Sequence, residues 1–376
     1  MVHTIVHTSD INLGHSFEGA GLLPEEGALW RQEIWQVLDQ ICQCAKEEKA
    51  DLLLVCGNLM DGELSPADRE RCRDLFQEIA PVQVVWILGE SDPKEDLGEW
   101  PDNVHRVPPG FKRYDFPEKD VVLWAESWSD AVWPDGFSQF IPKASQGQFQ
   151  ILMLHGEADQ EVSQYHPIDM QAILQMGIDY CALGHRNHPT CWGREGAVWA
   201  AYAGSPASVS FEDPGDPGFW IVELEKEGTS CLRRLQRRQT GRRRFVSQEI
   251  MLRGEQEAET IADRIAASFS SGNRRRDFCR AVLRGERGGF LPIDAETLRR
   301  LLVPSRFFSL TIVDQTTPEL SYDRIREANP DNLLGRYIET MQERIRKAGS
   351  ERERELLESA LAAGVEALRH SQEKGR

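Results

Sequence analysis

The sequence has 376 residues, of which 40% are hydrophobic and 28% are charged, and its formal net charge is −17. Because single hydrophobic cores stop growing at about 250–300 residues, we expect two domains, or one domain with a helical tail. No apolar run approaches the roughly 20 residues that cross a bilayer, and no signal-peptide pattern is visible, which excludes a membrane-spanning protein and predicts a cytoplasmic one. The acidic balance excludes a protein that coats nucleic acid indiscriminately.

The first two hundred residues alternate short apolar runs with helical patterns. Strands are predicted over TIVHTS (4–9), DLLLVCG (51–57) and VQVVWILG (82–89), and helices over 29–48 and 66–79. Alternating units of this length indicate an α/β layered sheet, whose functional loops lie beyond the carboxyl ends of the strands.

The following segment is richer in strands. Apolar runs occur at VVLWA (121–125), FQILMLHG (149–156), YCALGH (180–185), AVWAAYAG (197–204) and FWIVEL (219–224), with one clear helix over 167–177. This pattern favours a mixed α/β sandwich. No glycine-rich nucleotide-binding motif occurs.

The composition then changes to arginine-rich and polar. Seven arginines fall between Arg233 and Arg244, and we interpret 229–244 as a linker, either simply solvated or in contact with phosphate. We predict a small α+β domain over 245–318 and a helical tail over 319–376, which packs on its own domain or on a partner, after a first domain over 1–228.

The eight cysteines form no CxxC pair and no regular spacing. We expect reduced, mostly buried thiols rather than disulfides or a zinc ribbon, as in a reducing compartment.

Five turns, each directly after a predicted strand, carry polar residues that we expect to converge on one rim. They are Asp10 and Asn12; Gly57, Asn58 and Asp61; Gly89, Glu90, Ser91 and Asp92; His155 and Gly156; and Gly184, His185 and Asn187. Strand-end turns favour Gly, Asn and Asp for conformational reasons alone, so the significance lies in five such turns along one sheet.

The order and spacing of these turns resemble the calcineurin-like metallophosphoesterases, and specifically the SbcD-type DNA repair nucleases. That group has D-x-H, G-D-x-x-D, G-N-H-D, H-G and G-H-x-H. This chain has D-I-N (10–12), G-N-L-M-D (57–61), G-E-S-D (89–92), H-G (155–156) and G-H-R-N (184–187). AYAGSPASVSF (201–211) is similar to the group's Y-x-G-S-P segment. The small domain and the tail resemble the group's capping domain and the helices that dock on an SbcC-type ATPase.

The resemblance implies a metallophosphoesterase-type β-sandwich flanked by helices, and it implies two metal sites. The first would be held by Asp10, Asn12, Asn58 and Asn187, and the second by Asn58, Glu90, His155 and His185. Asn58 stands in place of the bridging aspartate, Asn12 and Asn187 in place of histidines, Glu90 in place of an asparagine, and Ser91 in place of the histidine thought to protonate the leaving group.

These departures predict a degenerate site. Two-metal phosphoryl transfer needs a negatively charged bridge between the cations, and Asn58 supplies a neutral amide. We therefore expect no two-metal centre, but one divalent metal, manganese or zinc, at Glu90, His155 and His185. In the simpler interpretation the histidines bond only to the backbone, and the three asparagines fill the former metal cavity with mutual hydrogen bonds.

The predicted function is that of an inactive or impaired SbcD-like subunit that binds DNA or an SbcC-type ATPase, with a homodimer as a further prospect. The alternative is an active exonuclease or phosphoesterase that uses the single metal. A regulatory scaffold without DNA contact is a third hypothesis.

Overall fold

The structure is a computed structural model of the whole chain. It describes residues 2–17, 20–95, 98–129, 148–158, 163, 165–193, 197–212, 215–227, 230–241, 243–255, 257–287, 294–318, 322–330 and 332–373.

A six-stranded sheet carries the amino-terminal half of the site. Its strands run in the order β14 (Ser230–Gln239), β13 (Gly218–Glu227), β1 (Val2–Thr8), β2 (Leu52–Cys56), β3 (Gln83–Ile87) and β4 (Val104–Arg106). The strands β1 to β4 are parallel, and β13 and β14 are antiparallel additions. The parallel strands β2 and β3 are apolar along almost their whole length because both faces of the sheet are covered.

A second six-stranded sheet carries the other half. Its order is β11 (Thr190–Trp192), β12 (Ala200–Tyr202), β10 (Tyr180–Gly184), β7 (Phe149–His155), β6 (Val121–Ser127) and β5 (Gly110–Phe116). A 3₁₀ turn (η1, Pro117–Lys119) joins β5 to β6. Side chains from both sheets form one buried cluster that includes Ile5, Leu54 and Val85 from the first and Leu123 and Ile151 from the second.

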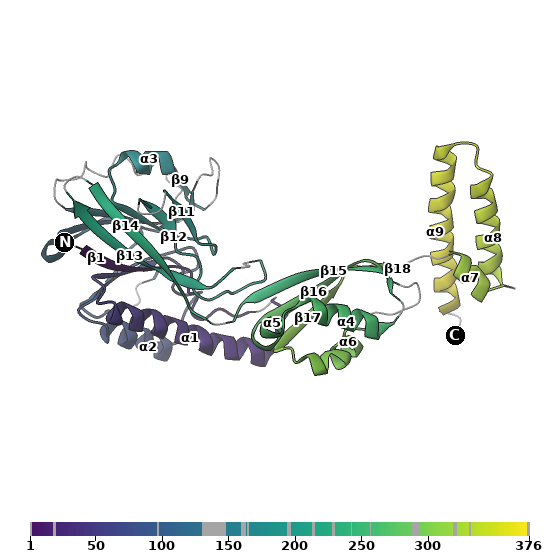
Figure 1. Cartoon of the computed structure of the whole chain (residues 1–376), viewed down its shortest axis with the longest axis horizontal. Helices are drawn as coiled ribbons and strands as arrows, with labels where there is room; N and C mark the ends of the chain where they lie inside the picture. Colours follow the sequence, from purple (N-terminus) through teal and green to yellow (C-terminus); the bar gives the residue numbers. More distant parts are fainter. Residues whose placement is uncertain are drawn as a thin grey trace. The chain divides into compact units, whose positions relative to one another are not determined.

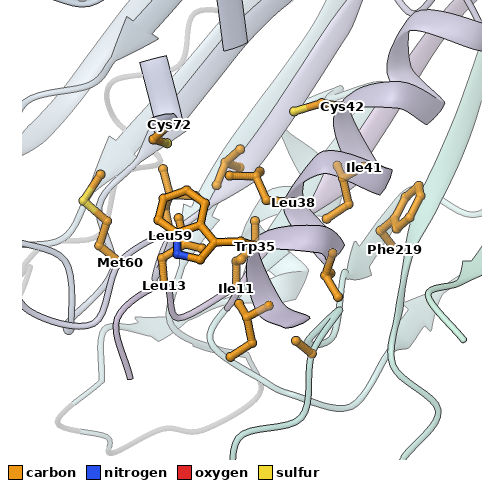
Figure 2. Packing of buried hydrophobic residues seen from close by; sticks show 14 of the residues in the cluster. Ile11, Leu13, Trp35, Leu38, Ile41, Cys42, Leu59, Met60, Cys72 and Phe219 are labelled. Atoms are coloured by element: carbon orange, nitrogen blue, oxygen red, sulfur yellow. The ribbon is translucent and has the colours of Figure 1, made fainter. Parts of the chain in front are cut away.

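Helices cover the outer faces of the sandwich. α1 (Pro24–Glu47) and α2 (Pro66–Gln77) lie along the first sheet (Figure 1). Trp35, Leu38 and Ile41 of α1 point into a buried cluster against the sheet (Figure 2). On the second sheet, α3 (Met170–Gln175) packs together with the short strands β8 (Glu157–Ala158) and β9 (Pro167–Ile168). The predicted α/β sandwich flanked by helices is confirmed.

The carboxyl-terminal part of the chain forms a smaller mixed region and a group of helices. The elements are β15 (Phe245–Glu255), α4 (Ala258–Ser268), α5 (Ser271–Arg276), β16 (Phe278–Arg287), α6 (Ala295–Leu302), η3 (Val303–Ser305), β17 (Ser309–Asp314), β18 (Thr317–Pro318), α7 (Tyr322–Ala328), α8 (Leu333–Arg346) and α9 (Glu351–Glu373). The last three helices share a core of their own around Ile338, Met341 and Leu361.

The chain divides into two compact units. The first contains Met1–Gln248, Phe269–Arg280 and Ser305–Thr311, and the second contains Glu249–Ser268, Ala281–Pro304 and Ile312–Arg376. No helix among the described residues is both long enough and apolar enough to cross a membrane.

The segment predicted as a linker, 229–244, is instead largely strand. Residues 230–239 form β14, which pairs with β13 along its whole length. The prediction was wrong because the arginines make the segment strongly polar. In the structure Arg234 lies directly opposite Glu223 on an exposed face of the sheet, and this pair of opposite charges stabilises the pairing of the two strands.

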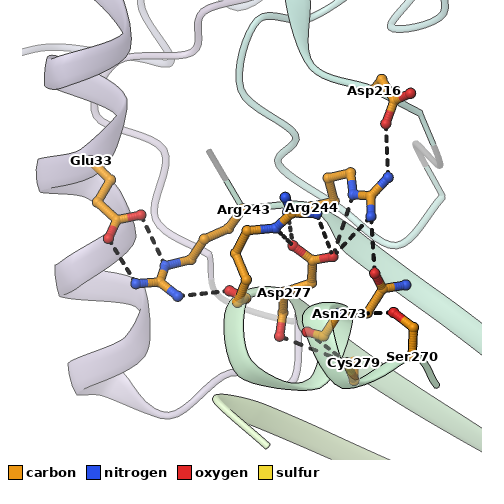
Figure 3. A network of polar contacts seen from close by, with 9 residues as sticks. Glu33, Asp216, Arg243, Arg244, Ser270, Asn273, Asp277 and Cys279 are labelled. Atoms are coloured by element: carbon orange, nitrogen blue, oxygen red, sulfur yellow. Dashed lines mark hydrogen bonds and ion pairs between the residues drawn. The ribbon is translucent and has the colours of Figure 1, made fainter. Parts of the chain in front are cut away.

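The described arginine side chains of this segment already have partners. Arg238 pairs with Glu48 at 2.8 Å, Arg234 with Glu223 at 3.6 Å, and Arg243 forms a two-pronged bond to Glu33 with both distances 2.9 Å. Figure 3 shows this last pair, and beside it Arg244 between Asp216 and Asp277. Arg237 donates to a main-chain carbonyl and lies over the Trp220 ring.

Asp277 provides the first test of the fold. Its side chain is fully buried and accepts from the guanidinium groups of Arg244, at 3.2 Å, and Arg276, at 2.6 Å. We expect Asp277→Asn to lower the free energy of unfolding by about 2–3 kcal/mol, because two cations lose a desolvated anionic partner. Urea denaturation measures this. Glu70→Gln, which breaks an exposed pair with Arg73, is the matched control and should change stability little; equal effects would contradict the prediction.

His7 provides a second test. It lies between the sheets, where its Nε2–H donates to the Leu183 carbonyl at 3.2 Å and its Nδ1 accepts from the Tyr180 hydroxyl at 2.9 Å. Burial lowers the pKa of His7 to about 3, so it is neutral in the folded protein, whereas the unfolded chain takes up a proton below about pH 6.5. Folding stability is therefore lost as the pH falls from 6.5 toward 3.

From this we expect the wild type to lose about 2 kcal/mol more between pH 7 and pH 5 than His7→Gln, which keeps a donor but does not titrate. Urea denaturation at the two pH values is the measurement. The exposed His188, changed to Gln, serves as control and keeps the wild-type pH dependence. An unchanged pH dependence in His7→Gln would show the prediction to be wrong.

Candidate functional site

The strand ends of both sheets bring the predicted turns to one rim. The loops after β1, β2 and β10 adopt left-handed backbone at Asp10 (φ 53°), Asn12 (φ 56°), Asn58 (φ 52°) and His185 (φ 100°). Asp and Asn tolerate this conformation better than most residues. These strained turns direct the polar side chains toward one another instead of along the strands.

Asp10 is the centre of the first half of the rim. It is buried, and its two carboxylate oxygens accept from the Asn58 amide at 2.9 Å and from the His185 main-chain N–H at 3.1 Å. The Asp10 carbonyl accepts from the Asn12 amide at 3.0 Å and from the Ser205 hydroxyl at 2.9 Å. Burial raises the pKa of Asp10, so this carboxylate depends on the donors around it.

The orientation of the Asn58 amide is fixed by its neighbours. Its Oδ1 accepts from the Ser91 main-chain N–H at 3.0 Å, so its NH₂ group must face Asp10. A donor therefore lies where the resemblance requires an anionic oxygen between two metals. Asn12 and Asn58 are joined to Asp10 by hydrogen bonds, whereas the interpretation from sequence expected mutual bonds among the three asparagines. Asn187 follows β10, and its carbonyl accepts from the Ser205 N–H at 3.0 Å.

Glu90 joins two histidines in the second half of the rim. One carboxylate oxygen lies 2.5 Å from Nε2 of His155 and the other 3.2 Å from Nδ1 of His185. Burial alone would raise the pKa of Glu90, but the two histidines hold it well below its usual range. Burial alone would lower the pKa of His155, but the carboxylates of Glu90 and Asp10 raise this pKa to about 9.

The main chain positions His155 closely. Its Nδ1–H donates to the Cys56 carbonyl at 2.8 Å, which directs Nε2 toward Glu90. Two glycines make room for the ring: a Cβ on Gly57 would lie 2.1 Å from His155 Nδ1, and one on Gly184 would lie 1.7 Å from the Cys56 carbonyl oxygen. Glycine is therefore required at both turns.

Asp92 supports the loop that carries Glu90 and Ser91. It is buried, and its carboxylate accepts from the main-chain N–H groups of Met60 and Gly89, both at 2.8 Å. Burial raises the pKa of Asp92 to about 6, although these two hydrogen bonds oppose the shift. The residue ties the turn after β3 to the turn after β2.

Sequence reasoning missed three residues of the rim. The Tyr165 ring lies 4.9 Å from that of His185, Trp128 packs edge-on against His155 at 6.1 Å, and Glu157 Oε1 lies 4.0 Å from His185 Nε2. Glu157 directly follows the His-Gly motif, and its position next to that motif could have predicted it as a residue of the rim. Tyr165 and Trp128 lie outside every motif and carried no signal.

The two halves of the rim differ in their fit to a metal ion. Glu90, His155 and His185 offer one ligand atom each, all within 4.8 Å of one another, and one carboxylate with two imidazoles suits a single divalent cation. Bound there, such an ion would polarise a phosphoryl oxygen or acidify a water. The half around Asp10 does not fit, because the Asn58 NH₂ group occupies one carboxylate oxygen and the Asn12 amide is turned to a carbonyl.

Comparison with known proteins identifies the class. Residues 3–188 match the family model described as calcineurin-like phosphoesterase, and this part of the chain belongs to the calcineurin-like metallophosphoesterase superfamily, a metal-dependent family. A search of curated proteins found no match.

Several solved structures are similar in fold. The anchor of the inner membrane complex of Plasmodium is 11% identical, with 62% of this chain and 84% of that chain covered and a TM-score of 0.38. Vps29 with zinc from Entamoeba histolytica is 13% identical (63% and 98% covered, TM-score 0.30). A dimetal phosphatase from Danio rerio is 10% identical (61% and 98%, TM-score 0.34).

Asn58→Asp tests the interpretation of the first half-site. The change sets a second carboxylate against the buried one of Asp10, so with a chelator present we expect a loss of stability of about 2 kcal/mol or more. Manganese should restore the lost stability, because a cation between two carboxylates removes their repulsion. Thermal unfolding with chelator and with manganese measures both effects.

Asn103→Asp is the matched control for this experiment. Asn103 is buried and donates to the Phe76 and Val82 carbonyls, so its replacement should destabilise the protein whether or not manganese is present. An Asn58→Asp variant as stable as the wild type in chelator, or one indifferent to manganese, would contradict the interpretation.

Proposed function

We propose that the chain is an SbcD-like subunit whose two-metal phosphoesterase site has degenerated. In this proposal it does not cleave phosphodiesters by two-metal chemistry, and it acts in the cytoplasm in DNA binding or repair with an SbcC-type ATPase. The observation that carries the loss of activity is the Asn58 NH₂ group, 2.9 Å from Asp10, at the position where the family resemblance places the bridging carboxylate.

The chemistry of the remaining rim supports this proposal. Two cations about 3.5–4 Å apart need an anionic bridge against their mutual repulsion, and an amide that donates to Asp10 offers none. Ser91, at the position of the family's proton donor, uses its main-chain N–H to hold Asn58. A serine hydroxyl is also far too weak an acid to replace an imidazolium near neutral pH.

The proposed roles are assigned to the domains that the sequence predicts. Residues 1–228 would form the phosphoesterase-like domain together with β14, 245–318 the capping domain, and 319–376 the helices that dock on the ATPase. The core of α7, α8 and α9 is in keeping with a separate helical module. A homodimer is part of the proposal through the resemblance alone.

The arginine run lends little support to the DNA contact. Arg234, Arg238, Arg243 and Arg244 are each paired with a carboxylate, so their charge is largely compensated within the protein. Phosphate contacts require positive charge that is available to the nucleic acid. The proposed DNA contact therefore rests on the resemblance of the capping domain.

One observation favours a second function, an active single-metal phosphoesterase or exonuclease. Glu90, His155 and His185 form the metal-ligand group described above. A lone divalent cation on such a set can acidify a water near neutral pH. The two proposals share this site and differ in whether it turns over.

A combined binding and cleavage assay separates them. Purified full-length protein is incubated with single- and double-stranded DNA in manganese, and bound and cleaved DNA are measured in the same samples. The main proposal predicts retention of DNA with no cleavage above the level of His185→Ala. Lys347→Ala breaks an exposed ion pair at the carboxyl end of α8. This variant, purified in the same way, controls for differences between protein preparations. Robust cleavage that His185→Ala abolishes would replace the main proposal by the second.

A further inference from the structure

Among the residues that the structure describes, Glu157 faces the rim histidine for which no hydrogen bond to a main-chain carbonyl is found. Its Oε1 lies 4.0 Å from Nε2 of His185, while Glu90 lies 3.2 Å from Nδ1 of the same ring. The two nitrogens of one imidazole therefore face two different carboxylates. His155 is arranged differently, since its second nitrogen donates to the Cys56 carbonyl.

The position of Glu157 is fixed by the strand in which it lies. Its main-chain N–H donates to the carbonyls of Tyr165, at 2.9 Å, and His166, at 3.1 Å. The Ser163 hydroxyl donates to Oε2 of the carboxylate, which turns Oε1 toward His185. The carboxylate thus has one oxygen held by a neighbour and the other directed at the imidazole.

The residues on either side of Glu157 are also tied down. The Tyr202 hydroxyl donates to the Gly156 carbonyl at 2.6 Å and accepts from the Ala158 N–H at 2.7 Å. A Cβ on Gly156 would lie 2.2 Å from the His166 carbonyl oxygen, so only glycine permits this close approach. The backbone on both sides of Glu157 is therefore fixed, with the carboxylate directed toward His185.

We propose that Glu157 is a positioning residue for a single divalent cation at Glu90, His155 and His185. Its carboxylate, 4.0 Å from Nε2 of His185, favours the tautomer with the proton on Nε2, so that the Nδ1 lone pair faces the cation. The inference rests on the single-metal site named under the proposed function. Carboxylates that orient a ligating histidine in this way fix its tautomer and increase its basicity, and their loss costs about 10–100-fold in metal affinity.

The two histidines are oriented by different kinds of group. His155 is oriented by a carbonyl of β2, which no side-chain substitution removes. His185 is oriented by a side chain, which mutagenesis removes without touching the three ligands. Glu157 is thereby distinguished from the ligands themselves, whose loss removes a metal–ligand bond outright.

The test uses full-length protein stripped of metal and titrated with zinc in competition with a coloured chelator. We expect Glu157→Ala to weaken zinc binding about 10–100-fold. Glu157→Gln should lose less, because its amide oxygen still favours the proton on Nε2. Glu63→Ala, an exposed glutamate on the loop after β2, removes the same charge and should bind zinc as the wild type does.

A spectroscopic measurement separates positioning from simple structural support. In zinc-loaded protein with ¹⁵N-labelled histidine, the Nε2 proton of His185 should be observed in the wild type and lost to exchange in Glu157→Ala. The thermal midpoint of the metal-free variants should stay at the wild-type value.

The outcomes are distinct. Equal zinc affinity in Glu157→Ala and wild type overturns the positioning role and leaves the single-metal site standing. A wild type that binds no zinc, or binds it equally well after His185→Ala, overturns both. A weaker affinity that comes with a lower metal-free midpoint and an unchanged His185 signal makes Glu157 merely structural, and also overturns the inference.

Discussion

The rim depends on one constraint, which is that the buried carboxylate of Asp10 must have cations or hydrogen-bond donors around it. An unpaired charge at such depth would cost several kcal/mol. In this chain an amide from the turn after β2 and a main-chain N–H from the loop after β10 satisfy it. The loops of the two sheets are therefore tied together by Asp10, and the neutral amide of Asn58 supplies one of the two donors to its carboxylate.

Much of the fold could be predicted from the sequence, because buried parallel strands are continuous apolar runs and the turns that follow them are rich in Gly, Asn and Asp. The strand β14 could not, since ten residues with four arginines resemble solvated chain until their partner strand is known. Its backbone pairs along its whole length with β13, and its arginines pair with Glu223, Glu225 and Glu48, the last of which lies 190 residues away along the chain. No local pattern carries that information.

The site divides in the same manner. Asp10, Asn58, Glu90, His155 and His185 could be placed on one rim because each ends a strand. Which atoms face one another could not, because that depends on left-handed turns and on a donor such as the Ser91 N–H that orients the Asn58 amide. Glu157 was missed because the motif comparison stopped at Gly156, although the next residue is held in a short strand against β9.

The glycines beside His155 restrict the backbone of the rim more strongly than its polar residues do. The polar residues of the rim lie on separate turns and are held by hydrogen bonds of their side chains. Gly57 and Gly184 admit no side chain, because any larger residue would collide with the imidazole or with the neighbouring strand. The glycines therefore determine how closely the turns and the His155 ring approach one another, while the polar side chains determine the charge and the donors of the rim.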